Sequence, residues 1–220
     1  MGSLAPFDRF AHPLHATFIY KNPDEQISVT ADFIQRGLER NERCVFLDMP
    51  DKLRLLREAL AERGIHVPAA EAKGALVLDS KRDFLDHGHF AGGKVIEFLD
   101  RAVNDALAHG FSALRPTGDM NWELGGDQDF HLLVDYEARL DEFVRTRPIV
   151  GMCQYQRYSV SSLAICNALQ THETVLMGSR CFEDNLFYEP PEVRLEPEGE
   201  RREQRRGEWM CRQLLRSEMH

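Results

Sequence analysis

The stretch RPTGDMNWE, residues 115–123, places a cation, a hydroxyl, two carboxylates, an amide and an indole in one short segment. Such a mixture can hold the polar end of a small ligand while the indole covers its apolar body. The candidate ligand-binding residues here are Arg115, Thr117, Asp119, Trp122 and Glu123. An alternative to ligand binding has equal weight: Asp119 caps the following turn and Arg115 pairs with a carboxylate, so that both residues only stabilise the loop.

A second set of candidates combines histidine, cysteine and tyrosine side chains: His15, Tyr20, Cys153, Tyr155 and His172. A histidine and a cysteine on neighbouring strands can coordinate a metal ion or form a nucleophile–base couple. If a metal is bound, His15, Cys153 and His172 are its candidate ligands. The sequence itself requires no cofactor, because each histidine can equally be a hydrogen-bonded or exposed residue. No GxSxG, HExxH or local Cys–His signature of an enzyme occurs.

The loop KNPDEQ, residues 21–26, lies where a nucleotide-binding α/β protein carries its phosphate cradle. Neither GxxxxGK[ST] nor GxGxxG occurs in the chain. Pro23 removes one backbone donor, and Asp24 and Glu25 place negative charge at a helix N-terminus, which repels phosphate. The sequence therefore argues against Walker-type ATP hydrolysis, and we expect a protein that is not an enzyme.

The elements that must position these residues follow from alternating β-rich runs and segments of helical period. Strands are expected at 16–20, 43–48, 75–79, 112–117, 149–155 and 174–179. Helices are expected at 24–40, 51–63, 94–109, 129–145, 161–171 and 203–217. This alternation predicts an α/β fold, with a mostly parallel sheet covered by helices on both faces. Ligands of such sheets bind outside the carboxyl ends of the strands.

Composition restricts the function further. A chain of 220 residues is expected to form about one domain. The formal net charge of −9 argues against a general nucleic-acid-binding surface. We also expect no membrane contact and a cytoplasmic location, because the sequence contains neither a membrane-spanning run nor a signal peptide. The 5 cysteines form no CxxC pair and are expected to be free thiols.

Several segments together resemble the MEDS domain, the methanogen/methylotroph sensory domain named after the regulator of dichloromethane dehalogenation. The resemblance covers about residues 12–192. It rests on His15 and Tyr20 around the first strand, on His172, and on the segments DEQISVTADFIQRGLERNERCVFL, LRPTGDMNW, YEARLDEF, MCQY and CFEDNLFYEPPE. The sequence departs from the family at Glu173, where a proline commonly follows the histidine, and it shows no complete output domain after residue 200.

The resemblance implies a three-layer RecA-like sheet, related to the circadian-clock ATPases, without a functional phosphate loop. It also implies a sensor of small, hydrocarbon-derived ligands that acts with a histidine kinase, a PAS module or a transcription regulator. The family's histidine and cysteine correspond to His15 and Cys153. The expected organisation is an N-terminal arm (1–11), a sensory domain (12–192) and a charged connector with a helix (193–220).

The leading hypothesis is a regulatory module that binds a small organic ligand in a degenerate nucleotide cleft and signals to a partner. A metal- or haem-dependent sensor, a residual nucleotide hydrolase and a non-catalytic scaffold are the alternatives. The charged terminal helix is the expected output element, and a homodimer could form through it.

Overall fold

The computed structural model describes residues 6–80, 85–86, 89–120, 130–197 and 199–217. Its main feature is a seven-stranded sheet with the order β3-β2-β6-β7-β1-β8-β9. Its strands pair in parallel except β9, which runs antiparallel to β8. They are β1 (Leu14–Tyr20), β2 (Arg43–Leu47), β3 (Leu76–Asp79), β6 (Leu114–Asp119), β7 (Val150–Gln156), β8 (Thr174–Met177) and β9 (Arg180–Phe182). The predicted α/β fold is confirmed.

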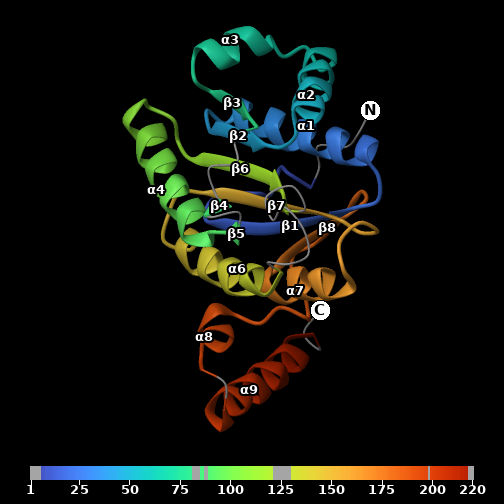
Figure 1. Ribbon diagram of the computed structural model, residues 1–220, viewed down its shortest axis with the longest axis vertical. Coiled ribbons are helices and arrows are strands. Elements are labelled where there is room, and N and C mark those ends of the chain that lie inside the picture. The colour runs from blue at the N-terminus through green and yellow to red at the C-terminus, as the bar shows by residue number, and fades with distance from the viewer. Residues whose placement is uncertain (1–5, 81–84, 87–88, 121–129, 198, 218–220) are drawn as a thin grey trace.

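Helices cover both faces of this sheet (Figure 1). One face carries α1 (Pro23–Glu39), α2 (Pro50–Glu62) and α3 (Val67–Ala72). The other carries α4 (Gly92–Ala108), α6 (Phe130–Val144) and α7 (Ser162–Thr171). Two short strands of two residues each, β4 (Leu85–Asp86) and β5 (His89–Phe90), pair antiparallel and precede α4. The layers follow the expected order of strands and helices along the chain.

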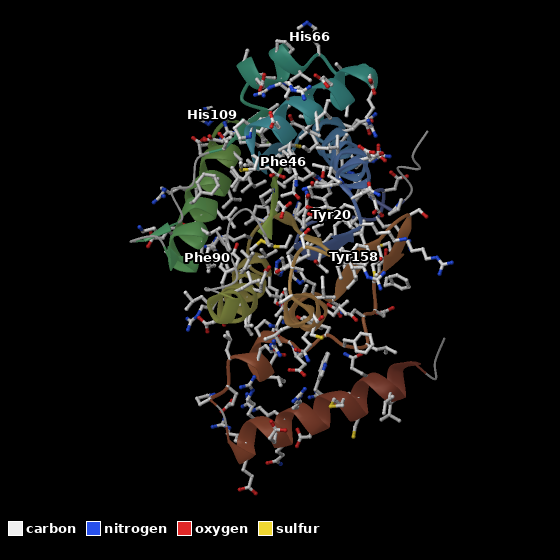
Figure 2. All side chains as sticks on the ribbon, turned by 45° about the vertical axis from the view of Figure 1, so that its right-hand side comes forward. Tyr20, Phe46, His66, Phe90, His109 and Tyr158 are labelled. Atoms are coloured by element: carbon white, nitrogen blue, oxygen red, sulfur yellow. The ribbon has the colours of Figure 1, made fainter. Side chains whose placement is uncertain are left out.

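Each face of the sheet has its own apolar core, because successive side chains of a strand point to opposite faces. Phe18 and Phe46 pack under α1 and α2, whereas Val45 and Tyr155 pack against the layer of α4 and α6. In Figure 2 side chains fill the molecule on both sides of the sheet, with Phe46 in the interior and His66 at the outer edge. The two faces can therefore carry two separate polar sites.

The N-terminus of α1 is capped by its own side chains. The Glu25 backbone N–H donates to Asn22 Oδ1 at 2.9 Å, and the Lys21 N–H donates to Glu25 Oε2 at 2.7 Å. Pro23 occupies the first turn, where its missing N–H costs no helical hydrogen bond. The helix end that would cradle a phosphate is thus occupied by the protein's own oxygen atoms.

The chain continues through α8 (Pro191–Arg194) into α9 (Glu200–Ser217), which lies beyond α6 and α7, away from the sheet (Figure 1). The Trp209 indole N–H donates to the Tyr188 carbonyl oxygen at 2.7 Å. The two rings meet edge to face, with their centroids 6.1 Å apart. α9 also exposes the apolar side chains of Met210, Leu214 and Leu215. The expected terminal helix is confirmed, and it starts earlier than predicted.

The structure also differs from the expected elements. β6 extends to Asp119, beyond the predicted end at residue 117, so Asp119 lies within the strand with Arg115 and Thr117 and not in the loop after it. The helix α3, the strand β9, the β4–β5 hairpin and α8 were not expected. None of the described helices has the length and apolarity needed to cross a membrane. The proposed division at residues 11 and 192 stays a prediction.

Candidate functional site

The candidate residues fall into two groups on opposite faces of the sheet. On β1, His15 and Thr17 face the layer of α6 and α7, whereas Phe18 and Tyr20 face α1 and α2. The first group is the His–Cys cluster, which we define as His15, Glu137, Cys153 and His172. The second is the Tyr20 network, defined as Tyr20, Gln26, Asp48, Lys52, Asp119 and Gln154.

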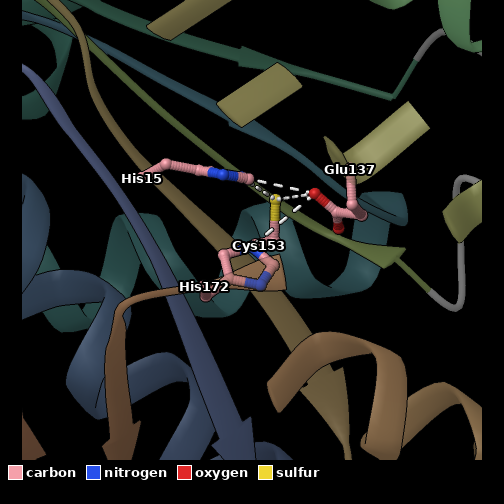
Figure 3. A group of neighbouring side chains, drawn as sticks. All are labelled: His15, Glu137, Cys153 and His172. Carbon is pink, nitrogen blue, oxygen red and sulfur yellow. Dashed lines mark hydrogen bonds and ion pairs between the residues drawn. The ribbon is translucent and has the colours of Figure 1, made fainter. Parts of the chain in front are cut away.

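Four elements bring the His–Cys cluster together (Figure 3). His15 lies on β1, Cys153 on the neighbouring strand β7, Glu137 on α6, and His172 just after α7. His15 Nε2 lies 3.5 Å from Cys153 Sγ and 3.3 Å from Glu137 Oε2. Glu137 Oε2 lies 3.4 Å from Cys153 Sγ and 3.6 Å from His172 Nε2. All four residues are buried, so water does not screen their interactions.

A surrounding layer of contacts orients these four side chains. Asp141, one helical turn after Glu137, places its Oδ1 3.4 Å from His15 Nδ1. The Tyr155 hydroxyl donates to Glu137 Oε1 at 2.5 Å. The His172 ring is held through Nδ1, which lies 2.8 Å from the Ala168 carbonyl oxygen.

The electrostatics of the cluster set its two histidines apart. Burial by itself would lower the pKa of His15, but hydrogen bonds and charge from Asp141 and Glu137 raise that pKa to about 9. Burial, followed by the charge on His15, lowers the pKa of His172 to about 4. Without a bound ion, His15 is therefore protonated and His172 is neutral at pH 7.

A cavity of about 40 Å³ adjoins the cluster on the same face of the sheet. Its walls come from β6, β7, α4 and α6, and they are mostly apolar; they include Leu99, Met120, Tyr136, Leu140 and Val144. His15 and Cys153 also line it and supply polar groups. An apolar cavity with a few converging polar groups is the usual form of a small-molecule site.

The Tyr20 network fills the carboxyl ends of the central strands on the opposite face. The Tyr20 hydroxyl donates to Asp119 Oδ2 at 2.5 Å, and Lys52 Nζ donates to the same oxygen at 2.8 Å. The Gln26 amide donates to Gln154 Oε1 at 2.8 Å and to Asp48 Oδ2 at 3.1 Å. The described side chains at this edge thus bind one another where a RecA-like ATPase would bind phosphate.

Two carboxyl groups share this network, and that affects Asp48. Burial first, and then the charge on Asp119, raise the pKa of Asp48 to about 6, although Lys52 acts in the opposite direction. Burial and Asp119 likewise raise the pKa of Tyr20, so its hydroxyl remains protonated and acts as a donor.

The structure divides the predicted site residues. His15, Cys153, Tyr155 and His172 meet in or beside the His–Cys cluster, and Tyr20 and Asp119 meet in the Tyr20 network. Thr117 joins that network by accepting from the Gln154 amide at 2.6 Å. Trp122 and Glu123 lie outside the described residues.

Arg115 lies apart from both groups. Its buried guanidinium pairs with Glu42 and lies 4.6 Å from the centre of the Phe33 ring. The pairing with a carboxylate, which the sequence left open, is therefore the arrangement found.

Residues that the sequence did not single out complete both groups: Glu137 and Asp141 beside the histidines, and Gln26, Asp48 and Lys52 in the Tyr20 network. Glu137 and Asp141 lie four positions apart on α6, a spacing that also describes a solvent-facing charged stripe.

Comparisons with known proteins agree with this fold. Residues 14–173 match the family model described as MEDS, the methanogen/methylotroph, DcmR sensory domain. The chain is 28% identical over 163 residues to the transcriptional repressor DcmR of Methylorubrum extorquens, covering 72% of this chain and 58% of that protein. It thus spans less than two thirds of that relative's length. A crystal structure of a KaiC-like protein from the hyperthermophilic archaeon Pyrococcus horikoshii has a similar fold, with a TM-score of 0.56 and 15% identity over 76% of this chain and 72% of that one.

Proposed function

The chain belongs to the MEDS family of sensory domains, and on that premise we propose that it senses a small organic molecule bound in the cavity beside His15 and Cys153. The observation that carries this proposal is a mostly apolar cavity that is lined by two members of the buried His–Cys cluster, His15 and Cys153. Sensing requires binding alone, so no bond is made or broken.

The size of the cavity limits the ligand. One water molecule needs about 10–15 Å³ of cavity volume. A cavity of 40 Å³ therefore accommodates roughly three or four non-hydrogen atoms. The walls favour an apolar body, and His15 and Cys153 favour one polar or polarisable group. A simple one- to three-carbon compound fits this description, and a nucleotide does not.

The ligand site proposed here is not the degenerate nucleotide cleft expected from the sequence. At that edge of the sheet Tyr20, Lys52 and Asp119 bind one another. The cavity lies instead on the opposite face, between the sheet and the helices α4 and α6. We therefore place sensing under these two helices.

The output of the sensor is proposed to be α9. His15 lies against Asp141, whose Oδ2 accepts from the Tyr188 hydroxyl at 2.5 Å, and the Tyr188 carbonyl accepts from Trp209 on α9. A ligand that moves His15 can thus shift Asp141 and Tyr188, and with them the position of α9. The partner would be a transcription regulator or a histidine kinase, and the exposed side of α9 could also pair two copies. The similarity to a transcriptional repressor supports a regulatory role.

Binding of dichloromethane, observed through the methyl chemical shifts of the protein, tests the proposal. About 1 kcal/mol per non-hydrogen atom gives a Kd of the order of millimolar for such a ligand. Leu99→Phe fills the cavity and should abolish saturable binding. Leu107→Phe makes the same change on the exposed side of the same helix and should leave the Kd unchanged. Equal binding by both variants would place the ligand elsewhere.

A further inference from the structure

We propose that the His–Cys cluster is a buried site for one divalent metal ion of the zinc class, coordinated by His15 Nε2, Glu137 Oε2, Cys153 Sγ and His172 Nε2. The inference rests on the positions of these four donor atoms, which all lie within 4.8 Å of one another. It does not depend on the proposed organic ligand, although His15 and Cys153 border both sites.

The distances between the donor atoms fit a tetrahedral ion. Zinc lies about 2.0–2.1 Å from nitrogen and about 2.3 Å from sulfur, so the edges of its tetrahedron measure about 3.3–3.8 Å. Four of the edges in the cluster are 3.3, 3.4, 3.5 and 3.6 Å. The remaining two edges, from His172 Nε2 to His15 Nε2 and to Cys153 Sγ, are within 4.8 Å, so His172 is the ligand that would move towards the other three when an ion binds.

The His172 ring is oriented as metal-bound histidines usually are. Its Nδ1 donates to the Ala168 carbonyl, which leaves Nε2 as the lone-pair nitrogen that faces the cluster. Within the described part of the chain, this fully buried Nε2 has no hydrogen-bond partner. It faces Glu137 Oε2 at 3.6 Å, so two acceptors point at each other. A cation between them removes this mismatch.

The other ligands are supported in the same manner. Asp141 lies on the far side of the His15 ring, at Nδ1, and so directs Nε2 into the cluster. The Tyr155 hydroxyl binds the second oxygen of Glu137 and leaves Oε2 for the ion. A carboxylate or carbonyl behind each ligating imidazole is the common arrangement in metal sites.

A metal-free cluster explains less of this geometry. Protonated His15 would pair with Glu137, and the Cys153 thiol would donate to the same carboxylate. That arrangement accounts for three of the residues and leaves His172 Nε2 facing an acceptor. With a divalent ion, one thiolate and one carboxylate balance its charge, which a fully buried site requires.

The donor set indicates which metals to test. Two imidazoles, one thiolate and one carboxylate suit zinc and the neighbouring divalent transition metals, and they do not suit magnesium or calcium. Two other histidines, His66 and His109, lie at the outer edge of the molecule (Figure 2).

The test uses the full chain, purified under reducing conditions, with metal analysis followed by titration of the metal-stripped protein with Co²⁺. We expect one ion per chain and the visible bands of tetrahedral cobalt, including a thiolate-to-cobalt charge-transfer band. Cys153→Ala should lose the charge-transfer band and bind Co²⁺ at least about 10-fold more weakly, as for other changes around metal sites. Cys44→Ala, which changes a buried cysteine on the other face of the sheet, should behave as the wild type.

His172→Asn provides a second variant, because asparagine can still donate to the Ala168 carbonyl but lacks the ligating nitrogen. It should also weaken Co²⁺ binding while circular dichroism shows a folded protein. Folded wild-type protein that contains no metal and gives no cobalt bands would overturn the proposal, as would unchanged affinity in both cluster variants. No organic ligand is present in these measurements, so their outcome is separate from that of the sensing proposal.

Discussion

His15 and Tyr20 lie on the same strand, β1, with their side chains on opposite faces of the sheet. His15 meets Cys153 and Glu137, and Tyr20 meets Asp119 and Lys52. The sheet therefore separates a buried group of potential metal ligands from a hydrogen-bonded network at the carboxyl ends of the central strands. This separation makes the two groups independently testable.

Tyr20→Phe should lower stability without changing the His–Cys cluster. The variant loses a buried hydroxyl that donates to Asp119, a bond worth about 1–3 kcal/mol because its acceptor is charged. Urea unfolding measures the loss, and Co²⁺ titration measures the cluster. Tyr158→Phe, at a largely exposed tyrosine, is the control and should change neither. A weaker affinity for Co²⁺ in Tyr20→Phe would mean that the faces are coupled.

Tyr188→Phe should disconnect α9 from the cavity. The variant keeps the ring against Trp209 but loses the hydroxyl that donates to Asp141. In the wild type we expect dichloromethane to change deuterium uptake in both β1 and α9, because local opening reports such coupling. In the variant the change in β1 should persist and the change in α9 should disappear. An unchanged response in α9 would rule out this route.

Asp48→Asn should alter the dependence of stability on pH. The pKa of Asp48 is raised from 3.8 to about 6 in the folded protein. Its contribution to stability is thus fully present below pH 3.8 and is lost as the pH rises through about 6. Above pH 7 the variant should be more stable than the wild type by about 1–3 kcal/mol, and the difference should shrink towards pH 4.

Urea unfolding between pH 4.5 and 8 measures this difference, with exposed Asp51→Asn as the control on the same helix. Parallel stability curves for Asp48→Asn and the wild type would show that Asp48 is ionised without cost in the folded protein.

Gly37→Ala should destabilise the fold through the buried Arg115–Glu42 pair. A methyl group at Gly37 would overlap the Arg115 side chain and lie 2.6 Å from Cys44 Sγ. Overpacking of this kind costs about 1–3 kcal/mol, which urea unfolding would detect. Gly207→Ala in α9 has open space around it and should be neutral or slightly stabilising. Equal stability of the two variants in urea would contradict the close packing around Gly37.

Much of the fold could be predicted because its strands and helices carry strong periodic signals. The apolar run of β1 and the helical stripe of α1 appear nearly at their expected bounds. The end of β6 was predicted too early, because Gly118 is a typical turn residue. In the structure Gly118 lies within β6 and pairs with Leu47 of β2.

The candidate site was only partly predictable. Successive side chains of a strand point to opposite faces, and Tyr20 follows His15 by five positions. The sequence of β1 therefore already places these two side chains on opposite faces. Glu137 and Asp141 gave no such signal, because carboxylates four apart on a helix usually face solvent. Only the packing of α6 over β1 and β7 buries them beside His15.

The most direct test of the central claim is a crystal structure of the chain exposed to dichloromethane. The account predicts density for the bound molecule in the cavity beside Leu99, His15 and Cys153, with no change at Tyr20 or Asp119. Density among the Tyr20 network, or an empty cavity in crystals that hold dichloromethane elsewhere, would contradict it.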